Sequence, residues 1–352
     1  RVMSKKILFG LIIPAFLIAG TSTNNAAFAA DAKLVAAAQK EGKLIVYHSI
    51  NRKVLKKMAK AFGKKYGIKV SATRKSTGGV NKMVAAERLA GVLRCDVVSA
   101  GDPTLFRTWK KQGVLQPYVP TSTSAFYKGT ADPEGFSSPA RRTFASIGYS
   151  KKQVKDADAP KGWEDILDPK WKGKIGIIDP RTSGPGRYWL AGMVKRFGWG
   201  YIEKIAQQNP IMIKSSSSAK LNLISGEVAL TIPGSEHSLT KAIKKGEPVG
   251  LVYPKEGSIV KTSRVGICSK AKNINAAKLW IEYETGKVGQ ALISKHGAYI
   301  TVRPDVAVHH PRPKGALDPS SLIDVPEDYM RKNKKAQRKK FADIMSKAML
   351  SN

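Results

Sequence analysis

The sequence predicts an α/β protein built of two lobes. Short apolar segments bounded by glycine or proline alternate along the chain with amphipathic segments of helical periodicity. The chain has 352 residues, of which 42% are hydrophobic, and this length suits two cores better than one small core. Extended segments at 144–149 and 248–253 are placed to cross between the lobes, which makes each lobe discontinuous in sequence.

The N-terminal segment has the pattern of a secretory signal peptide. Residues 1–6 are basic, residues 7–20 form an apolar run, and Ala27-Phe28-Ala29 is a small-x-small cleavage signal. About fourteen apolar residues are few for a membrane span, and no cysteine that could carry a lipid lies near them. We therefore expect residues 1–30 to be removed on export, most naturally to a bacterial periplasm.

The first part of the chain repeats the order strand, polar loop and helix. Strands are expected at 44–47, 68–72 and 96–99, loops at 48–52, 76–79 and 100–104, and helices at 54–66, 80–89 and 105–111. In an open α/β sheet, ligands bind beyond the carboxyl ends of the strands. We therefore expect the three loops to share one edge of the sheet.

The second half repeats this arrangement, beginning with the segment PKGWEDILDPKWKGKIGIIDPRTSGPG at 160–186. Further on, strands are expected at 175–178 and 228–232, loops at 182–186, 215–218 and 233–237, and helices at 188–197 and 219–224. The free backbone N–H groups at such helix starts favour an anion or another oxygen-rich ligand. Facing loops from two lobes would form a cleft that suits a small solute.

Charge and cysteine content leave several alternatives open. The formal net charge is +35, but the basic residues are spread along the chain with no basic motif interleaved with aromatic residues, which favours a solvated basic surface over nucleic-acid binding. The densest basic run, at 331–340, falls in an expected terminal helix at 327–350. Cys95 and Cys268 are consistent with a disulfide or with two buried thiols.

No catalytic or nucleotide-binding motif is present in the sequence. Ser235, Glu236 and His237 are neighbours in the chain, but adjacency does not make a triad. The segment 183–187, SGPGR, matches neither the G-x-S-x-G nucleophile elbow nor the G-x-G-x-x-G fingerprint. We therefore expect a protein that is not an enzyme, with no catalytic residues and no cofactor.

Several segments occur in a fixed order over nearly the whole chain after residue 30. They read AAAQKEGKLIVYHS, STGGVNKMVAAERLAGVLRCDVVSAGDPTLFRTWKKQGVLQPY, GWEDILDPKWKGKIGIIDPRTSGPG, GWGYIEKI, SGEVALTI and AAKLWIEYETGKVGQALISKHGAYITVRPDV. Together they resemble the periplasmic solute-binding proteins of ABC importers, in the branch that contains the ferric-ion-binding proteins. The resemblance implies a type II periplasmic binding protein, in which hinge strands join two lobes and the cleft between them closes on the ligand.

The lobe boundaries follow from the two expected crossings. Residues 1–30 are the signal peptide, 31–143 with 250–300 form the first lobe, and 144–249 with 301–352 form the second lobe and its C-terminal helix. Each lobe would then contribute its own strand-end loops to the cleft.

The iron ligands of that branch do not carry over to this chain. The resemblance implies a histidine after the first strand, an acidic residue after the third and adjacent tyrosines after the GEVAL strand, and alignment places Asn51, Gly101, Gly234 and Ser235 at these positions. Hard Fe(III) favours anionic oxygen ligands, which these residues do not supply. We expect no metal site, and a ferric receptor is the alternative.

A second set of metal-binding side chains is also open to test. His48, Asp102, Glu236 and His237 are placed near the expected cleft, although their spacing matches no recognised metal signature.

Hydroxyls, glycines and backbone amides dominate the expected cleft. The residues that we expect to bind the ligand are Ser49, Asn51, Thr77, Gly78, Asp102, Ser183, Gly184, Arg187, Ser215, Ser216, Glu236 and His237. Helix N-termini favour a carboxylate, phosphate or phosphonate, which Arg181 or Arg187 is placed to clamp. A serine or threonine at a helix start also serves as a plain N-cap.

These observations predict the periplasmic substrate-binding component of an ABC importer. It would capture a small organic anion, such as a phosphorylated or carboxylated compound, by closure of the cleft. The resemblance implies that its partners are an inner-membrane permease and the ATPase of that permease, and we expect a monomer that binds no nucleic acid. An alternative of another class is a basic protein that binds polyanions or a membrane surface.

Overall fold

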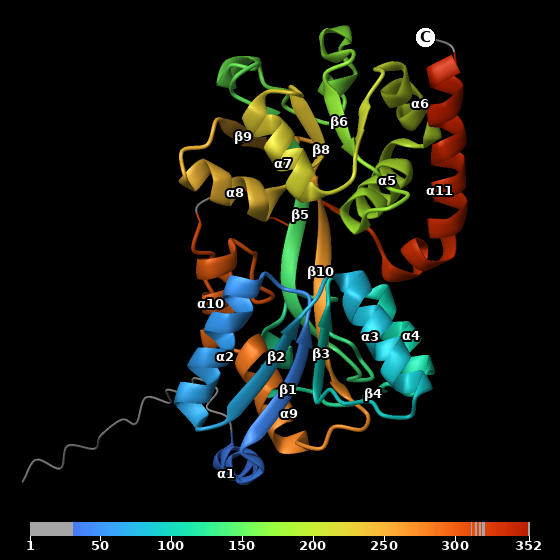
Figure 1. Cartoon of the computed structure of the whole chain (residues 1–352). Coiled ribbons are helices and arrows are strands. Elements are labelled where there is room, and N and C mark those ends of the chain that lie inside the picture. Colours follow the sequence, from blue (N-terminus) through green and yellow to red (C-terminus); the bar gives the residue numbers. More distant parts are fainter. Residues whose placement is uncertain (1–30, 311, 314, 317, 319–320, 351–352) are drawn as a thin grey trace, which may run out of the picture.

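The computed structural model describes residues 31–310, 312–313, 315–316, 318 and 321–350, and the predicted signal peptide lies outside these residues. The described chain forms two lobes, one above the other in Figure 1. A helix that is long and apolar enough to span a membrane does not occur in the described ranges.

One mixed sheet runs through both lobes. In the described part of the chain it has eleven strands, with the order β2-β1-β3-β10-β5-β8-β6-β7, while β4 and β11 pair with β10 and β9 pairs with β5. The strands are β1 Lys43–His48, β2 Lys69–Arg74, β3 Val97–Ala100, β4 Leu115–Gln116, β5 Ser138–Ser150, β6 Ile175–Ile178, β7 Ile211–Ile213, β8 Leu230–Ser235, β9 Val249–Val252, β10 Ser258–Cys268 and β11 Leu322–Asp324. The parallel strands β1, β2 and β3 belong to the first lobe, and β6, β7 and β8 to the second.

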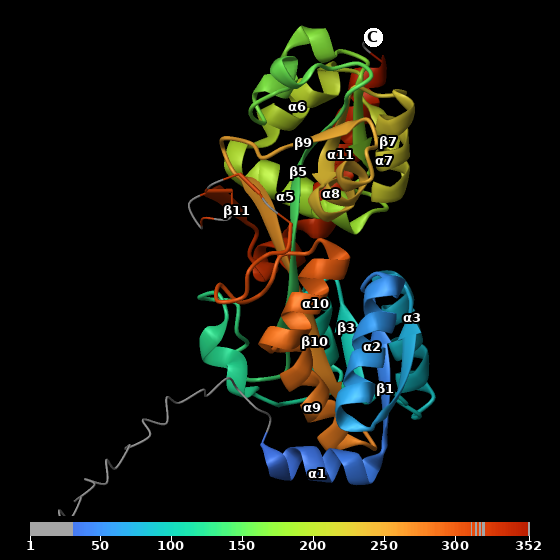
Figure 2. The same cartoon turned by 90° about the vertical axis from the view of Figure 1, so that its left-hand side faces the viewer.

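Helices cover the strands of each lobe. The first lobe has α1 Ala32–Glu41, α2 Arg52–Tyr66, α3 Thr77–Leu89, α4 Thr104–Lys111, α9 Ile274–Thr285 and α10 Lys287–Gly297. The second lobe has α5 Gly184–Phe197, α6 Trp199–Gln207, α7 Ser216–Ser225, α8 Glu236–Lys244 and α11 Glu327–Leu350. Figures 1 and 2 show these two sets of helices in separate lobes.

Each lobe buries an aromatic-rich core of its own. In the first lobe Phe62 of α2 lies edge-on to Trp280 of α9, with ring centroids 5.1 Å apart. In the second lobe Trp163, Trp189 and Phe341 are fully buried in one cluster. Separate cores are what the length of the chain predicts, because a single core stops growing at about 250–300 residues.

The antiparallel strands β5 and β10 are the long connections between the lobes (Figure 1). The prediction of a crossing at 144–149 agrees with β5. The second predicted crossing, at 248–253, is wrong because β9 pairs with residues 147–150 of β5 inside the second lobe. The crossing is made instead by β10, whose run of polar residues from Lys261 to Arg264 hides it from a search for apolar strands.

Several helices begin earlier than the sequence predicts. Helix α3 begins at Thr77 because the Ser76 hydroxyl accepts the amide of Gly79 at 3.1 Å, and the Ser215 hydroxyl caps α7 in the same way at 3.1 Å. These caps satisfy N–H groups of the first turn and extend the helices into glycine- and serine-rich segments. Predicted bounds for β6 and α11 agree with the structure.

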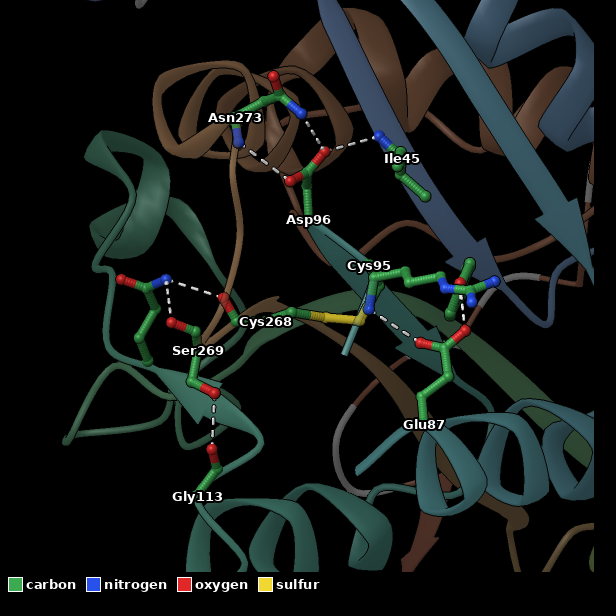
Figure 3. Close-up of a disulfide and its surroundings, with 11 residues drawn as sticks. Ile45, Glu87, Cys95, Asp96, Gly113, Cys268, Ser269 and Asn273 are labelled. Atoms are coloured by element: carbon green, nitrogen blue, oxygen red, sulfur yellow. Dashed lines mark hydrogen bonds between the residues drawn. A yellow bond between two sulfur atoms is a disulfide. The ribbon is translucent and has the colours of Figure 1, made fainter. Parts of the chain in front are cut away.

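A disulfide joins Cys95, just before β3, to Cys268 at the end of β10 (Figure 3). The two Cα atoms are 5.9 Å apart and the residues are 173 positions apart in sequence. Beside it, the Asp96 carboxylate accepts hydrogen bonds from the backbone N–H of Ile45 at 2.8 Å and from Asn273 at 2.9 and 3.1 Å. The cross-link and this network fix β1, β3 and β10 at the end of the first lobe distant from the other lobe.

The disulfide is expected to contribute strongly to stability, because it restricts the unfolded chain over a long loop. We predict that the double variant Cys95→Ala/Cys268→Ala loses about 2–5 kcal/mol of unfolding free energy. Urea unfolding followed by fluorescence measures this loss. A reductant added during unfolding should lower the urea midpoint of the parent protein and leave that of the double variant unchanged. Equal midpoints of the two proteins without reductant would contradict the prediction.

Candidate functional site

A cavity of about 950 Å³ lies between the lobes. Residues near the N-termini of α2 and α3 line it from the first lobe, and residues of α7 and α8 line it from the second. Segments of β5 and β10 lie between these two groups. A cavity of this size at a lobe interface accommodates a small organic molecule.

The structure brings part of the predicted set of ligand-binding residues to this cavity. Ser49, Asn51, Thr77, Ser216 and His237 are among its lining residues. The other predicted residues do not line it, namely Gly78, Asp102, Ser183, Gly184, Arg187, Ser215 and Glu236. From the loop at 182–186, only Pro185 reaches the lining.

Some of the predicted residues have local partners instead. The Asn51 carboxamide caps α2 by accepting the amide of Lys53 at 2.9 Å. The Asp102 carboxylate accepts the backbone amide and the hydroxyl of Thr104 at 3.1 and 2.8 Å. The Arg181 guanidinium donates to the Asp179 carboxylate at 2.9 and 3.0 Å. Asn51 therefore acts as a helix N-cap.

Glu236 is held in a buried network away from the cavity. Its carboxylate lies 2.6 Å from Arg312 and accepts the Tyr253 hydroxyl at 3.0 Å. Burial raises the pKa of Glu236, and Arg312 opposes that shift. Arg312 also donates to the carbonyl of Ala298 at 3.1 Å, which ties the start of α8 to the end of α10. Glu236 Oε1 is therefore engaged with protein groups, whereas Oε2 has no hydrogen-bond partner in the described part of the chain.

His48 also has a structural role. It is completely buried, with Nε2 3.0 Å from the Glu284 carboxylate and Nδ1 accepting the amide of Ile50 at 2.9 Å. Burial lowers the pKa of His48, so a neutral ring that donates from Nε2 satisfies both contacts. The second set of possible metal ligands is thus not brought together. Within the described ranges, the structure has no group of three or more His, Cys, Asp or Glu residues that could hold a metal.

Two cationic side chains that are not among the predicted ligand-binding residues, Arg141 and Lys261, line the cavity. Arg141 is 5% exposed, and its Nε and Nη1 atoms have no hydrogen-bond partner in the described part of the chain. Its Nη2 atom lies 3.5 Å from the Ser49 hydroxyl. Lys261 is half-buried, and its Nζ atom lies 5.5 Å from the centroid of the Tyr188 ring. Burial, together with Arg141, lowers the pKa of Lys261 to about 8.

The pairing of β5 with β10 explains why these side chains meet. Arg141 is opposite Ser263 and Thr143 is opposite Lys261, so the alternation of side chains places all four on one face of the ribbon. All four line the cavity. The neighbouring Arg142 points to the other face, where its guanidinium lies 4.2 Å from the centroid of the Tyr127 ring.

A single point beside Gly101 is in reach of three polar groups. A Cβ atom at Gly101 would lie 2.9 Å from Thr77 Oγ1, 3.8 Å from Arg141 Nη2 and 3.8 Å from Lys261 Nζ. The Gly101 backbone N–H donates to the same Thr77 hydroxyl at 3.2 Å. Two cations and one hydroxyl therefore converge where glycine leaves space, which suits an oxyanion. We call these three residues the inner anion group.

The whole cavity has an excess of positive charge. Its cationic lining residues are Lys53, Arg74, Arg141, Lys220, Lys241, Lys244, Lys245, Lys261 and Lys295. Glu247 is the acidic residue of this lining in the described part of the chain. Charge of one sign in a cleft with low-dielectric walls raises the local concentration of oppositely charged solutes.

The amino-acid sequence is similar to those of several known proteins. The chain is 27% identical over 340 residues to an uncharacterized protein of Haemophilus influenzae, which covers 90% of this chain and 94% of that protein. It is 23% identical over 257 residues to a putative 2-aminoethylphosphonate-binding periplasmic protein of Salmonella typhimurium, which covers 70% and 73%.

Two solved structures share the fold. One is the periplasmic binding protein AfuA of Actinobacillus pleuropneumoniae with bound fructose-6-phosphate, at a TM-score of 0.71 and 23% identity, covering 87% of this chain and 99% of that one. The other is iron-bound HitA of Pseudomonas aeruginosa, at a TM-score of 0.72 and 20% identity, covering 85% and 99%. The predicted type II fold is confirmed.

The family model described as bacterial extracellular solute-binding protein matches residues 95–333, which is more than half of the chain. Together with the two lobes and the cavity between them, this match confirms the predicted class of protein. The chain therefore belongs to the family of bacterial extracellular solute-binding proteins.

Proposed function

We propose that this protein is the periplasmic receptor of an ABC importer for a small organic anion, such as a phosphate ester, a phosphonate or a carboxylate. The observation that carries the proposal is the inner anion group, in which Thr77, Arg141 and Lys261 converge on one point. Two relatives support it: AfuA has fructose-6-phosphate bound, and the Salmonella typhimurium protein is named as a putative 2-aminoethylphosphonate-binding protein.

The energetics of Arg141 favour a bound anion. A buried guanidinium with two unpartnered nitrogen atoms has lost water without gaining a full set of hydrogen bonds. An oxyanion at the inner anion group would supply charge-assisted hydrogen bonds to Arg141 and Lys261. Binding of an anion would therefore offset the free-energy cost of removing the Arg141 guanidinium from water.

Closure of the lobes follows from where the contacts lie. Thr77 belongs to the first lobe and His237 to the second, and both line the cavity. A solute that contacts both lobes stabilises the closed form over the open form. We propose that the signal peptide exports the chain, that the lobe boundaries lie within β5 and β10, and that the closed monomer delivers its solute to the permease.

The charge of the lining opposes the ferric alternative. Fe(III) would have to enter a cavity with nine Lys and Arg side chains beside one carboxylate in the described residues. Like charges in a partly buried site repel more strongly than in bulk water. Tyr188 and Tyr299 line the cavity, but burial raises the pKa of Tyr188 well above its usual value, which disfavours the phenolate.

A thermal-shift screen followed by calorimetry tests the proposal. We expect organic phosphates, phosphonates or carboxylates to stabilise the purified protein, because they bind the folded form alone. Fe(III) and polyamines should give no shift, and the recovered ligand should be chemically unchanged. Tight Fe(III) binding without any response to organic anions would overturn the proposal.

A methyl group at Gly101 should block the inner anion group. We predict that Gly101→Ala weakens anion binding by about tenfold or more, which corresponds to about 1.4 kcal/mol. The matched control is Gly78→Ala, because a Cβ atom there meets nothing within 4 Å. Calorimetry on both variants measures the effect, and equal affinities of the two variants and the parent would contradict the placement of the anion.

Anion binding should weaken in alkali. Lys261 has a pKa of about 8, so it is charged and binds the anion below this pH, and it loses its charge above it. For fructose-6-phosphate, which keeps its full phosphate charge in this range, we expect affinity to fall by up to about tenfold per pH unit above pH 8. Lys261→Arg should remove this dependence because arginine stays charged. A flat profile for the parent protein would contradict a contact between the anion and a Lys261 that titrates near pH 8.

A further inference from the structure

A second group of cations lines the same cavity. We call Lys53, Lys220, Lys241 and Lys245 the outer lysine group, because Lys53 and Lys245 are exposed whereas Arg141 is buried. Lys53 comes from α2 in the first lobe, and the other three come from α7 and the end of α8 in the second. The group thus lies on both sides of the cleft.

The outer lysine group has no counter-charge of its own. In the described part of the chain, no carboxylate lies within 4.0 Å of these four ammonium groups. Lys241 is half-buried, and its pKa is lowered by burial and by the charges of Lys220, Lys53 and Lys245. Mutual repulsion among these lysines would be relieved by an anion bound between them.

An aromatic pair lies between the two cationic groups. The Tyr299 ring has Arg141 Cζ 5.2 Å from its centroid and Lys241 Nζ 5.7 Å from it. The His237 ring lies 4.7 Å from the Tyr299 ring, and burial, together with Lys241 and Arg141, lowers the pKa of His237 to about 3. His237 is therefore neutral at physiological pH. Because the Tyr299 ring lies near both Arg141 and Lys241, a single small molecule can contact the inner anion group and the outer lysine group.

The start of α7 adds favourable groups beside Lys220. Ser216 and Ser217, in the first turn of this helix, line the cavity. The partial positive charge of a helix N-terminus adds to the attraction of lysines for an anion. The polar surface around Lys220 is thus able to bind oxygen atoms as well as charge.

We propose that the outer lysine group is a second anion subsite, and that the solute is an organic molecule with an anionic group at each end. A bisphosphorylated compound or a phosphorylated carboxylate has this chemistry. One end binds the inner anion group, the middle contacts Tyr299 and His237, and the other end binds Lys220 and Lys241. This inference rests on the proposed function and names the substrate class of the same site.

Matched pairs of probes test the inference. Calorimetry at about 0.15 M salt, where long-range attraction is screened, compares fructose-6-phosphate with fructose-1,6-bisphosphate and glycerol-3-phosphate with 3-phosphoglycerate. We expect the doubly anionic member of at least one pair to bind about tenfold tighter or more. In the double variant Lys220→Met/Lys241→Met this advantage should disappear, while the affinity for the singly anionic member stays within about twofold.

Two further variants separate the possible outcomes. Arg141→Met should weaken both members of a pair, because both use the inner anion group. Lys334→Met/Lys335→Met removes the same charge from the exposed face of α11, outside the cavity lining, and should leave both affinities unchanged.

The inference fails if the two members of every pair bind equally, or if Lys220→Met/Lys241→Met weakens both equally, which would make these lysines general attractors of anions. The proposed function stands in both cases. If no organic anion binds the parent protein, the proposed function fails as well.

Discussion

The pairing of β5 with β10 is the interaction on which the rest of the molecule depends. These strands join the lobes, and they also carry Arg141 and Lys261 on the face that lines the cavity. In the proposed function, the charges that bind the solute therefore lie on the strands that connect the lobes. A bound anion reduces the repulsion between Arg141 and Lys261, so binding and the preferred shape of the hinge are linked through the same residues.

The alternation of strands and helices is visible in the sequence, and so is most of the fold. Strand β6 has its predicted bounds because it is a short apolar run between Gly173 and Pro180, and helix α11 has them because it follows Pro326 and contains neither glycine nor proline. Helix starts at Thr77 and Ser216 are less visible, because serine caps stabilise helical turns whose own residues have low helix propensity. The polar strand β10 is hidden for a related reason, since pairing on both sides stabilises it without an apolar run.

The site is predicted less well than the fold. Ser49, Thr77 and His237 were accessible to sequence reasoning, because they follow strands at helix starts. Arg141 was not, because only the register of β5 against β10 shows that it faces the cavity while Arg142 faces away. One signal was nevertheless present, since two adjacent arginines in an otherwise buried strand require a partner or a function.

The disulfide has a mechanical consequence for lobe movement. Cys268 anchors the end of β10 to Cys95, two residues before the start of β3, so the cross-link ties this end of the strand to the first lobe. The register of β10 against β5 shifts between Ser263 and Arg264, just beyond the cavity-facing residues. Residues 258–263, which include Lys261, lie on the far side of this shift from the cross-link. Because the cross-link fixes one end of β10 to the first lobe, we expect any bending of this strand on lobe closure to occur nearer to Lys261 and the proposed anion site.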